Sequence, residues 1–125
     1  MAHVAVKADF PQHGLTVKLS LFTFIEENVH VVYSPALDLY GYGNDEHEAR
    51  HSFEVALQEY ILHTAEHKTL DKDLKKYGWT IDKKHGALQS PDVSTLLQKN
   101  SVFKNFVNTH AFKKFDVSVQ LPAVA

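Results

Sequence analysis

The chain has 125 residues, of which 44% are hydrophobic and 22% charged, a balance that excludes a disordered or collagen-like chain and is typical of one globular domain. It contains no cysteine, which excludes disulfides, thiolate zinc sites and cysteine nucleophiles. Residues 1–6 carry no signal-peptide pattern and no apolar run reaches the roughly 18 residues of a membrane span, so we expect a cytoplasmic protein.

Charge is divided unevenly along the chain. Residues 1–65 hold three basic side chains and nine carboxylates, whereas residues 66–125 hold ten lysines and six carboxylates. An acidic half suits a basic protein partner, and a basic half can contact phosphates or complement the acidic half of the same chain. Since only one of the basic residues is arginine, bidentate recognition of guanine edges is not expected.

The first part of the chain predicts three strands. Residues 15–25 alternate apolar with polar, residues 29–33 follow a polar break as a hairpin partner, and residues 39–42 can form a short third strand. Phe22 and Phe24 fall on the face that is polar earlier in the first strand. The far half of this strand is therefore apolar on both faces, and another element must cover it.

A helix is predicted to begin after Asp45, because Asp45 and Glu48 have the spacing of a capping box. It is expected to end near His67. One stripe of this helix faces the sheet at three-and-four spacing: Ala49, Phe53, Ala56, Leu57, Tyr60 and Ile61.

The rest of the chain predicts shorter elements. A helix at 70–77 is ended by Gly78, and residues 79–81 alternate as a brief strand. Ser90 has the form of a cap with Pro91 in the first helical position, and the apolar side of this helix is formed by Val93, Leu96 and Leu97. A further helical stretch is expected to hold Val102, Phe103, Phe106 and Val107. Residues 117–121 alternate as a last strand.

The sharpest chemical motif is H-E-x-x-H at His47, Glu48 and His51, the helical pattern in which two histidines hold zinc and the glutamate activates water. The apolar stripe of the same helix turns both histidines toward solvent. The second pair, His63 and His67, is rotated by roughly 160° around the helix, so no third ligand converges. We interpret these residues as surface residues and expect no metal, no cofactor and no catalysis. The alternative, a zinc protease, would show one stoichiometric zinc in a tag-free preparation.

One run of residues carries a family resemblance: Val31-Val32-Tyr33, Ser34-Pro35-Ala36-Leu37, Gly43 followed five residues later by Glu48-Ala49, then Ala56-Leu57 and Tyr60. Over about residues 15–61 the chain resembles the HicB family, the antitoxin components of bacterial toxin–antitoxin pairs. The resemblance implies a three-stranded antiparallel sheet with a helix on one face, a reduced ribonuclease H topology, and a binding role. An active ribonuclease H site needs a carboxylate on its first strand, and residues 15–25 hold none.

We therefore predict one α+β domain over residues 1–125. Its HicB-like core spans residues 15–67, and residues 68–125 add helices and a last strand that pack on this core. In one arrangement the last strand pairs at the sheet edge while Phe103, Phe106 and Phe112 cover Phe22 and Phe24. In the other, these surfaces are exchanged across a dimer.

The leading hypothesis is a non-catalytic HicB-like protein that binds a small basic toxin and self-associates as a homo-oligomer, with Phe22, Phe24 and Val32 as candidate partner-binding residues. The alternative is a nucleic-acid-binding module in segment 68–84, with these candidates: Lys75, Lys76, Trp79, Lys83 and Lys84. Against that alternative, Trp79 can be a core residue and the lysines a solvated rim.

Overall fold

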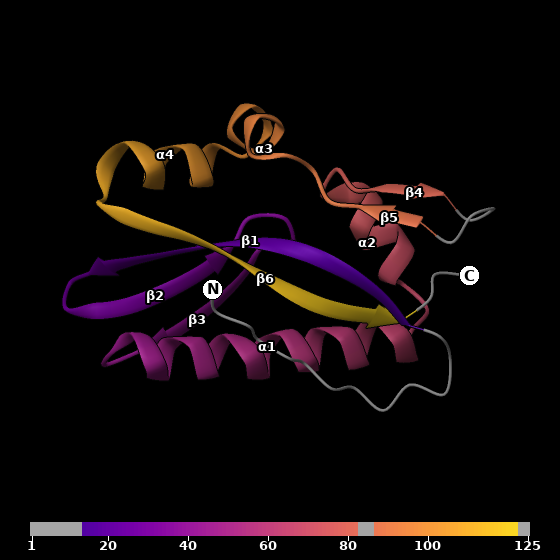
Figure 1. Ribbon diagram of the computed structural model, residues 1–125, viewed down its shortest axis with the longest axis horizontal. Coiled ribbons are helices and arrows are strands. Elements are labelled where there is room, and N and C mark those ends of the chain that lie inside the picture. Colours follow the sequence, from indigo (N-terminus) through magenta and orange to yellow (C-terminus); the bar gives the residue numbers. More distant parts are fainter. Residues whose placement is uncertain (1–13, 83–86, 123–125) are drawn as a thin grey trace.

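The computed structural model describes residues 14–82 and 87–122, so residues 1–6 and the candidates Lys83 and Lys84 lie outside it. Within these ranges the elements form three layers (Figure 1). Helix α1 (Glu46–Glu66) covers one face of a four-stranded sheet, and helices α3 (Val93–Lys99) and α4 (Ser101–Thr109) lie over the opposite face. The predicted α+β class is confirmed.

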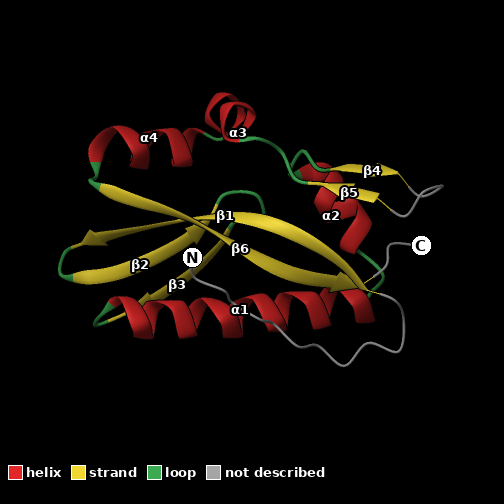
Figure 2. Ribbon diagram, viewed as in Figure 1, coloured by secondary structure: helices red, strands yellow, loops and turns green. Residues whose placement is uncertain are grey.

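The sheet has the strand order β3-β2-β1-β6, and every neighbouring pair is antiparallel. The three predicted strands are present, and the expected three-stranded sheet is extended by a fourth strand at the β1 edge (Figure 2). This last strand begins at Phe112, opposite Phe24, and is longer than its alternating pattern predicts. The strand bounds are as follows: β1 Gly14–Glu26, β2 Val29–Ser34, β3 Leu39–Gly43 and β6 Phe112–Pro122.

The turn between β1 and β2 consists of two residues, Glu27 and Asn28, with φ of 50° and 67°. Two successive residues with positive φ are typical of a type I′ turn, whose twist matches that of the flanking strands. The turn fixes the register in which Glu26 pairs with Val29. It leaves this end of the hairpin projecting from the sheet (Figure 1).

Helix α1 begins and ends where the sequence predicts. Asp45 is its N-cap and His67 its C-cap. The helix packs closely on β3, since a Cβ on Gly41 would lie 2.4 Å from the carbonyl oxygen of Ala49 and 2.4 Å from the backbone nitrogen of Phe53. Only glycine permits this distance between helix and strand.

The C-terminal part differs from the prediction in two places. Residues 87–89 form an additional strand, β5, which pairs with β4. Ser90 is not the cap of α3: Asp92 is, and its carboxylate accepts a 2.7 Å hydrogen bond from the backbone N–H of Thr95, while Pro91 precedes the cap. A carboxylate satisfies a helix N-terminus and also complements its dipole. The remaining bounds are α2 Leu70–Lys76, β4 Thr80–Asp82 and β5 Ala87–Gln89.

Each face of the sheet has its own core. Between the sheet and α1 lies a mainly aliphatic core that includes Leu19, Leu21, Val32, Leu57, Val117 and Val119 together with the ring of Phe53. On the other face lies an aromatic core that includes Phe22, Phe24, Tyr33 and Phe103. The arrangement in which C-terminal phenylalanines cover Phe22 and Phe24 is therefore present within one chain.

Candidate functional site

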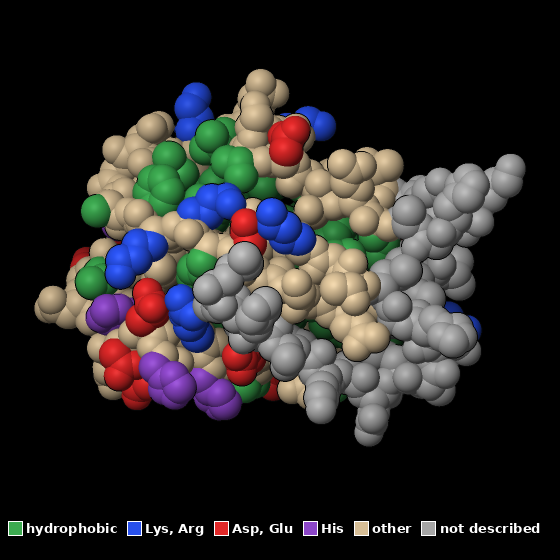
Figure 3. Space-filling view, in the orientation of Figure 1, with side chains coloured by type: hydrophobic (Ala, Val, Ile, Leu, Met, Phe, Trp, Pro, Cys, Tyr) green, Lys and Arg blue, Asp and Glu red, His purple; other side chains and the backbone are tan. Residues whose placement is uncertain are grey.

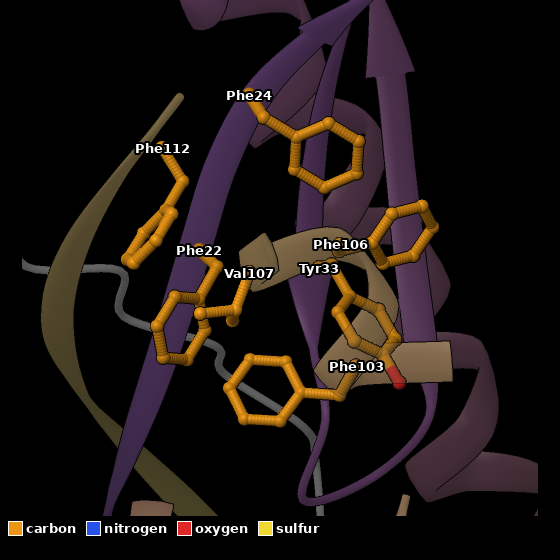
Figure 4. A pocket seen from close by; sticks show the side chains of 7 residues that line it. All are labelled: Phe22, Phe24, Tyr33, Phe103, Phe106, Val107 and Phe112. Carbon is orange, nitrogen blue, oxygen red and sulfur yellow. The ribbon is translucent and has the colours of Figure 1, made fainter. Parts of the chain in front are cut away.

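Aromatic side chains fill the space between the sheet and α4, and they point toward one another (Figure 4). The ring centroid of Phe22 lies 4.7 Å from that of Phe103, and the centroid of Phe24 lies 4.7 Å from that of Phe106. The gap enclosed by these rings measures about 10 Å³, room for one water molecule. This region is a packed core and offers no space for a ligand.

Tyr33 lies in this aromatic core, and its hydroxyl forms two hydrogen bonds. The hydroxyl donates a 3.3 Å hydrogen bond to the carboxylate of Asp38 and accepts one of 3.0 Å from the side-chain amide of Asn100. The ring stacks on Tyr40 with centroids 4.4 Å apart. Burial raises the pKa of Tyr33 above its ordinary value of 10.0, so the hydroxyl stays neutral and serves as a structural link between β2 and α4.

The residues that the sequence suggests for partner binding lie inside these cores. Phe22 and Phe24 are each 4% exposed because α4 covers them, and Val32 is fully buried in the core beneath α1. Their apolar character has a packing role in this structure. A partner surface must be sought among other residues.

The candidates for nucleic-acid binding that lie within the described residues do not form one exposed surface. The indole of Trp79 is buried, and its Nε1–H donates a 2.7 Å hydrogen bond to the carbonyl of Ala36, so its ring is not free to stack on a base. The alternative interpretation of Trp79 as a core residue is confirmed. Lys75 and Lys76 are exposed on α2, and Lys83 and Lys84 lie outside the described residues.

The H-E-x-x-H motif lies at the start of α1 with His47 and His51 exposed. Its glutamate takes part in capping, since a Glu48 carboxylate oxygen accepts a 3.0 Å hydrogen bond from the backbone N–H of Asn44. Within residues 14–82 and 87–122, no three histidine, aspartate or glutamate side chains converge to hold a metal ion. Glu48 of the motif therefore has a local structural function at the start of α1.

Exposed apolar side chains gather instead at one end of the sheet, which we call the hairpin end: the β1–β2 turn, the end of β3 and the start of β6. Ile25 is 56% exposed, Val29 39%, Tyr42 55% and Phe112 41%. Ile25 lies on the face of β1 that α1 covers, whereas Tyr42 and Phe112 lie on the opposite face, so the exposed apolar side chains surround this end of the sheet. Apolar side chains left exposed in a folded protein are candidates for an interaction site. The hairpin end is the candidate functional site.

Two grooves run across the hairpin end. The first, of about 420 Å³, lies between β1, the start of β6 and the first turn of α1, and its lining residues are Thr23, Phe24, Ile25, His30, Glu46, Ala111, Phe112 and Lys113. The second, of about 350 Å³, lies beside β3 and is lined by Val29, Tyr42, Gly43, Asn44 and Glu48. Each groove combines apolar walls with one carboxylate, Glu46 in the first and Glu48 in the second, and the first groove also includes Lys113.

The rim of the hairpin end is acidic. Five carboxylates surround it, from the turn and from the start of α1: Glu26, Glu27, Asp45, Glu46 and Glu48. A carboxylate oxygen of Glu46 lies 3.2 Å from a guanidinium nitrogen of Arg50, whose guanidinium carbon lies 4.1 Å from the ring centroid of Phe115. Figure 3 shows acidic and histidine side chains gathered over the beginning of α1, with lysine and arginine mostly over the side that carries β6 and α4.

Sequence reasoning missed Ile25, Val29, Tyr42 and Phe112 as a surface. The usable signal was position: Ile25 and Val29 lie on either side of the polar run Glu26-Glu27-Asn28, at the end of a hairpin. The hydrophobicity of the side chain alone does not separate Ile25 from Phe24, which is buried by α4.

None of the helices in residues 14–82 and 87–122 is long and apolar enough to cross a membrane. Comparison of the chain with protein-family models, with curated proteins and with solved structures finds no match. The inference of function therefore depends on the residues of the hairpin end.

Proposed function

We propose that the protein is a non-catalytic, HicB-like binding protein whose hairpin end receives a small basic protein, as an antitoxin receives its toxin. One observation carries the proposal: four exposed apolar side chains lie at the same end of the sheet as five carboxylates, of which Glu46 and Glu48 line the grooves. Apolar side chains at the centre of an interface supply affinity, and a charged rim selects a partner of opposite charge.

The sequence pattern and the strand order are compatible with this proposal. The antiparallel β3-β2-β1 meander with α1 packed on one face is compatible with the three-stranded sheet and covering helix that the HicB resemblance implies. The fourth strand and the helices α3 and α4 are additions to that arrangement. They leave the hairpin end uncovered.

The shape of the grooves favours a protein over a small molecule. Both grooves lie open at the surface, whereas small-molecule sites enclose most of the ligand. The acidic rim also disfavours nucleic acid, because phosphates are repelled by carboxylates. The occupant is therefore expected to be a protein with lysine or arginine around an apolar centre.

Affinity capture from the source cells, with mass spectrometry and the absorbance ratio of the eluate, tests this proposal. Three baits are compared: the unmodified chain, the groove variant Ile25→Asp, and the matched control Leu62→Asp. Leu62 is 46% exposed on the outer side of α1, outside both grooves. We expect a small basic protein with the unmodified chain and the control, and its loss with Ile25→Asp.

The captured protein is then purified and mixed with the chain, because binding must be direct. Reversal of the rim charge in Glu26→Lys with Glu27→Lys is expected to weaken binding at least about tenfold, and added salt is expected to weaken the unmodified complex. The molar mass of the free chain, measured by light scattering, tests the expected self-association. Equal capture by Ile25→Asp, or recovery of nucleic acid alone, would overturn the proposal.

A further inference from the structure

The C-terminal end of α1 carries a pair of histidines at the opposite end of this helix from the partner grooves. His63 and His67 are both exposed, one helical turn apart, and their ring centroids lie 4.2 Å from each other. Side chains at this spacing project from the same side of a helix. The two imidazoles are therefore already in contact.

A backbone hydrogen bond orients one of the two rings. The Nδ1 atom of His67 lies 2.9 Å from the carbonyl oxygen of His63. A carbonyl oxygen only accepts, so Nδ1 carries the proton and Nε2 carries the free lone pair. Metal-ligating histidines commonly have this arrangement, in which one ring nitrogen donates to a carbonyl and the other faces the metal.

We propose that His63 and His67 together bind one divalent transition-metal ion of the zinc, nickel and copper group through their Nε2 atoms. Each Nε2 must lie about 2.0–2.1 Å from the ion, which places the two nitrogens roughly 3 Å apart. The two ring planes are inclined by 35° to each other, so both side chains must rotate to point their Nε2 lone pairs at one ion. Water completes the coordination.

Two features of the surroundings favour this ion class. His63 lies in the last turn of α1 and His67 is its C-cap, where the helix dipole favours a positive charge. Imidazole ligands suit zinc, nickel and copper, whereas magnesium and calcium prefer oxygen. The site supplies two protein ligands and so differs from the full zinc site that H-E-x-x-H suggests. It departs from the expectation that the chain holds no metal.

The chain offers a matched control on the same helix. His47 and His51 have the same spacing and are also exposed, but no ring contact joins them in the described structure, and Glu48 between them is engaged in the cap. If spacing alone were sufficient, both pairs would bind alike. If preformed ring contact matters, His63 and His67 bind more tightly.

Isothermal titration of the tag-free full chain with zinc chloride, and separately with nickel chloride, tests the proposal. We expect one ion per chain at the tighter site, a loss of at least about tenfold in affinity in the double variant His63→Asn with His67→Asn, and no loss in His47→Asn with His51→Asn. Magnesium chloride in excess is expected not to compete.

A second measurement needs no substitution. Substoichiometric nickel or copper is expected to broaden the NMR signals of the last turn of α1 and to leave those of its first turn sharp. Broadening at the first turn, equal affinity in the His63 and His67 double variant, or no binding at millimolar metal would overturn the proposal. Since the partner grooves lie at the other end of α1, these outcomes are independent of the capture experiment.

Discussion

Asp45 and Glu48 are joined by a hydrogen bond of 2.8 Å, in which the backbone N–H of Glu48 donates to the carboxylate of Asp45. The carboxylate of Glu48 reaches back to the N–H of Asn44. Two of the free amides that precede and begin α1 are thereby satisfied. The same glutamate that completes a metalloprotease motif in the sequence is thus used to start a helix.

Loss of this cap is expected to weaken the fold by a measurable amount. Asp45→Ala should lower the free energy of unfolding by about 1 kcal/mol, and Asp45→Asn by less, because an amide oxygen also caps. Urea unfolding followed by circular dichroism measures both. The control is Glu59→Ala in the exposed middle of α1, expected within about 0.5 kcal/mol of the unmodified chain. An equal effect of Asp45→Ala and the control would contradict this account.

The close packing of α1 on β3 predicts a larger effect at Gly41. A methyl group there would overlap backbone atoms of Ala49 and Phe53, which cannot move without displacing the helix. Gly41→Ala should therefore cost roughly 3 kcal/mol or more. Gly78→Ala is the comparison: its added Cβ would lie 3.6 Å from Pro91, so only its φ of 93° opposes the substitution and the cost is about 1 kcal/mol. Calorimetric midpoints rank the two variants, and the reverse order would be evidence against this packing argument.

The sequence predicts α1 and the β1–β2 hairpin well because their signals are local. Asp45 and Glu48 are three residues apart, and the alternation at residues 15–25 has the period of a strand. The same holds for the short helix that Gly78 ends. In each case the residues that decide the structure are neighbours in the chain.

The candidate site could not be predicted because its exposure depends on distant contacts. Phe24 is buried by Phe106, which lies on α4, while Ile25 next to it remains open. The start of β6 at Phe112 is fixed by pairing with Phe24, a contact between residues far apart in the sequence. Periodicity tells which face a residue occupies, but not which helix covers that face.

Substitutions at two positions of β1, Phe22 and Ile25, should separate packing from binding. Phe22→Ala removes a ring that contacts Phe103 and Phe112 and should cost about 3–5 kcal/mol. Ile25→Ala, at a residue that is 56% exposed, should change stability by about 0.5 kcal/mol or less. Chemical denaturation gives both values. A large loss in Ile25→Ala would mean that the hairpin end is part of a core and not a docking surface.

The hydrogen bond between Trp79 and Ala36 joins the segment after α2 to the loop after β2. Trp79→Phe keeps an aromatic ring but removes the pyrrole part of the indole and leaves the buried Ala36 carbonyl without this donor, so a cost of about 1–3 kcal/mol or more is expected. Thermal unfolding by circular dichroism is the measurement, since Trp79 is the only tryptophan and its fluorescence is lost. Tyr77→Phe, at a half-buried position nearby, is the control. An unchanged midpoint in Trp79→Phe would show that the indole N–H contributes nothing.

The surroundings of Asp116 on β6 predict how the free energy of unfolding depends on pH. Its carboxylate accepts hydrogen bonds from Ser20 (3.0 Å) and Lys114 (2.9 Å) and lies 3.3 Å from the Lys18 ammonium. Partial burial opposes the charge, but the hydrogen bonds from Lys114, Ser20 and Lys18 prevail and lower the pKa of Asp116 below its ordinary value of 3.8. The folded state therefore binds this proton less readily than the unfolded state does.

A lowered pKa in the folded state means that the stabilisation is present above pH 3.8 and is lost as the pH falls below it. Asp116→Asn should lower the free energy of unfolding by about 0.5–1 kcal/mol at pH 7, because the cluster is partly solvent-screened. The difference seen at pH 7 should shrink when the measurement is repeated below pH 3.8, because protonation makes the aspartate resemble the amide. Urea unfolding at both pH values decides, with Glu59→Gln on α1 as a carboxylate control. A difference that persists undiminished at low pH would assign the effect to packing of the side chain instead of to its charge.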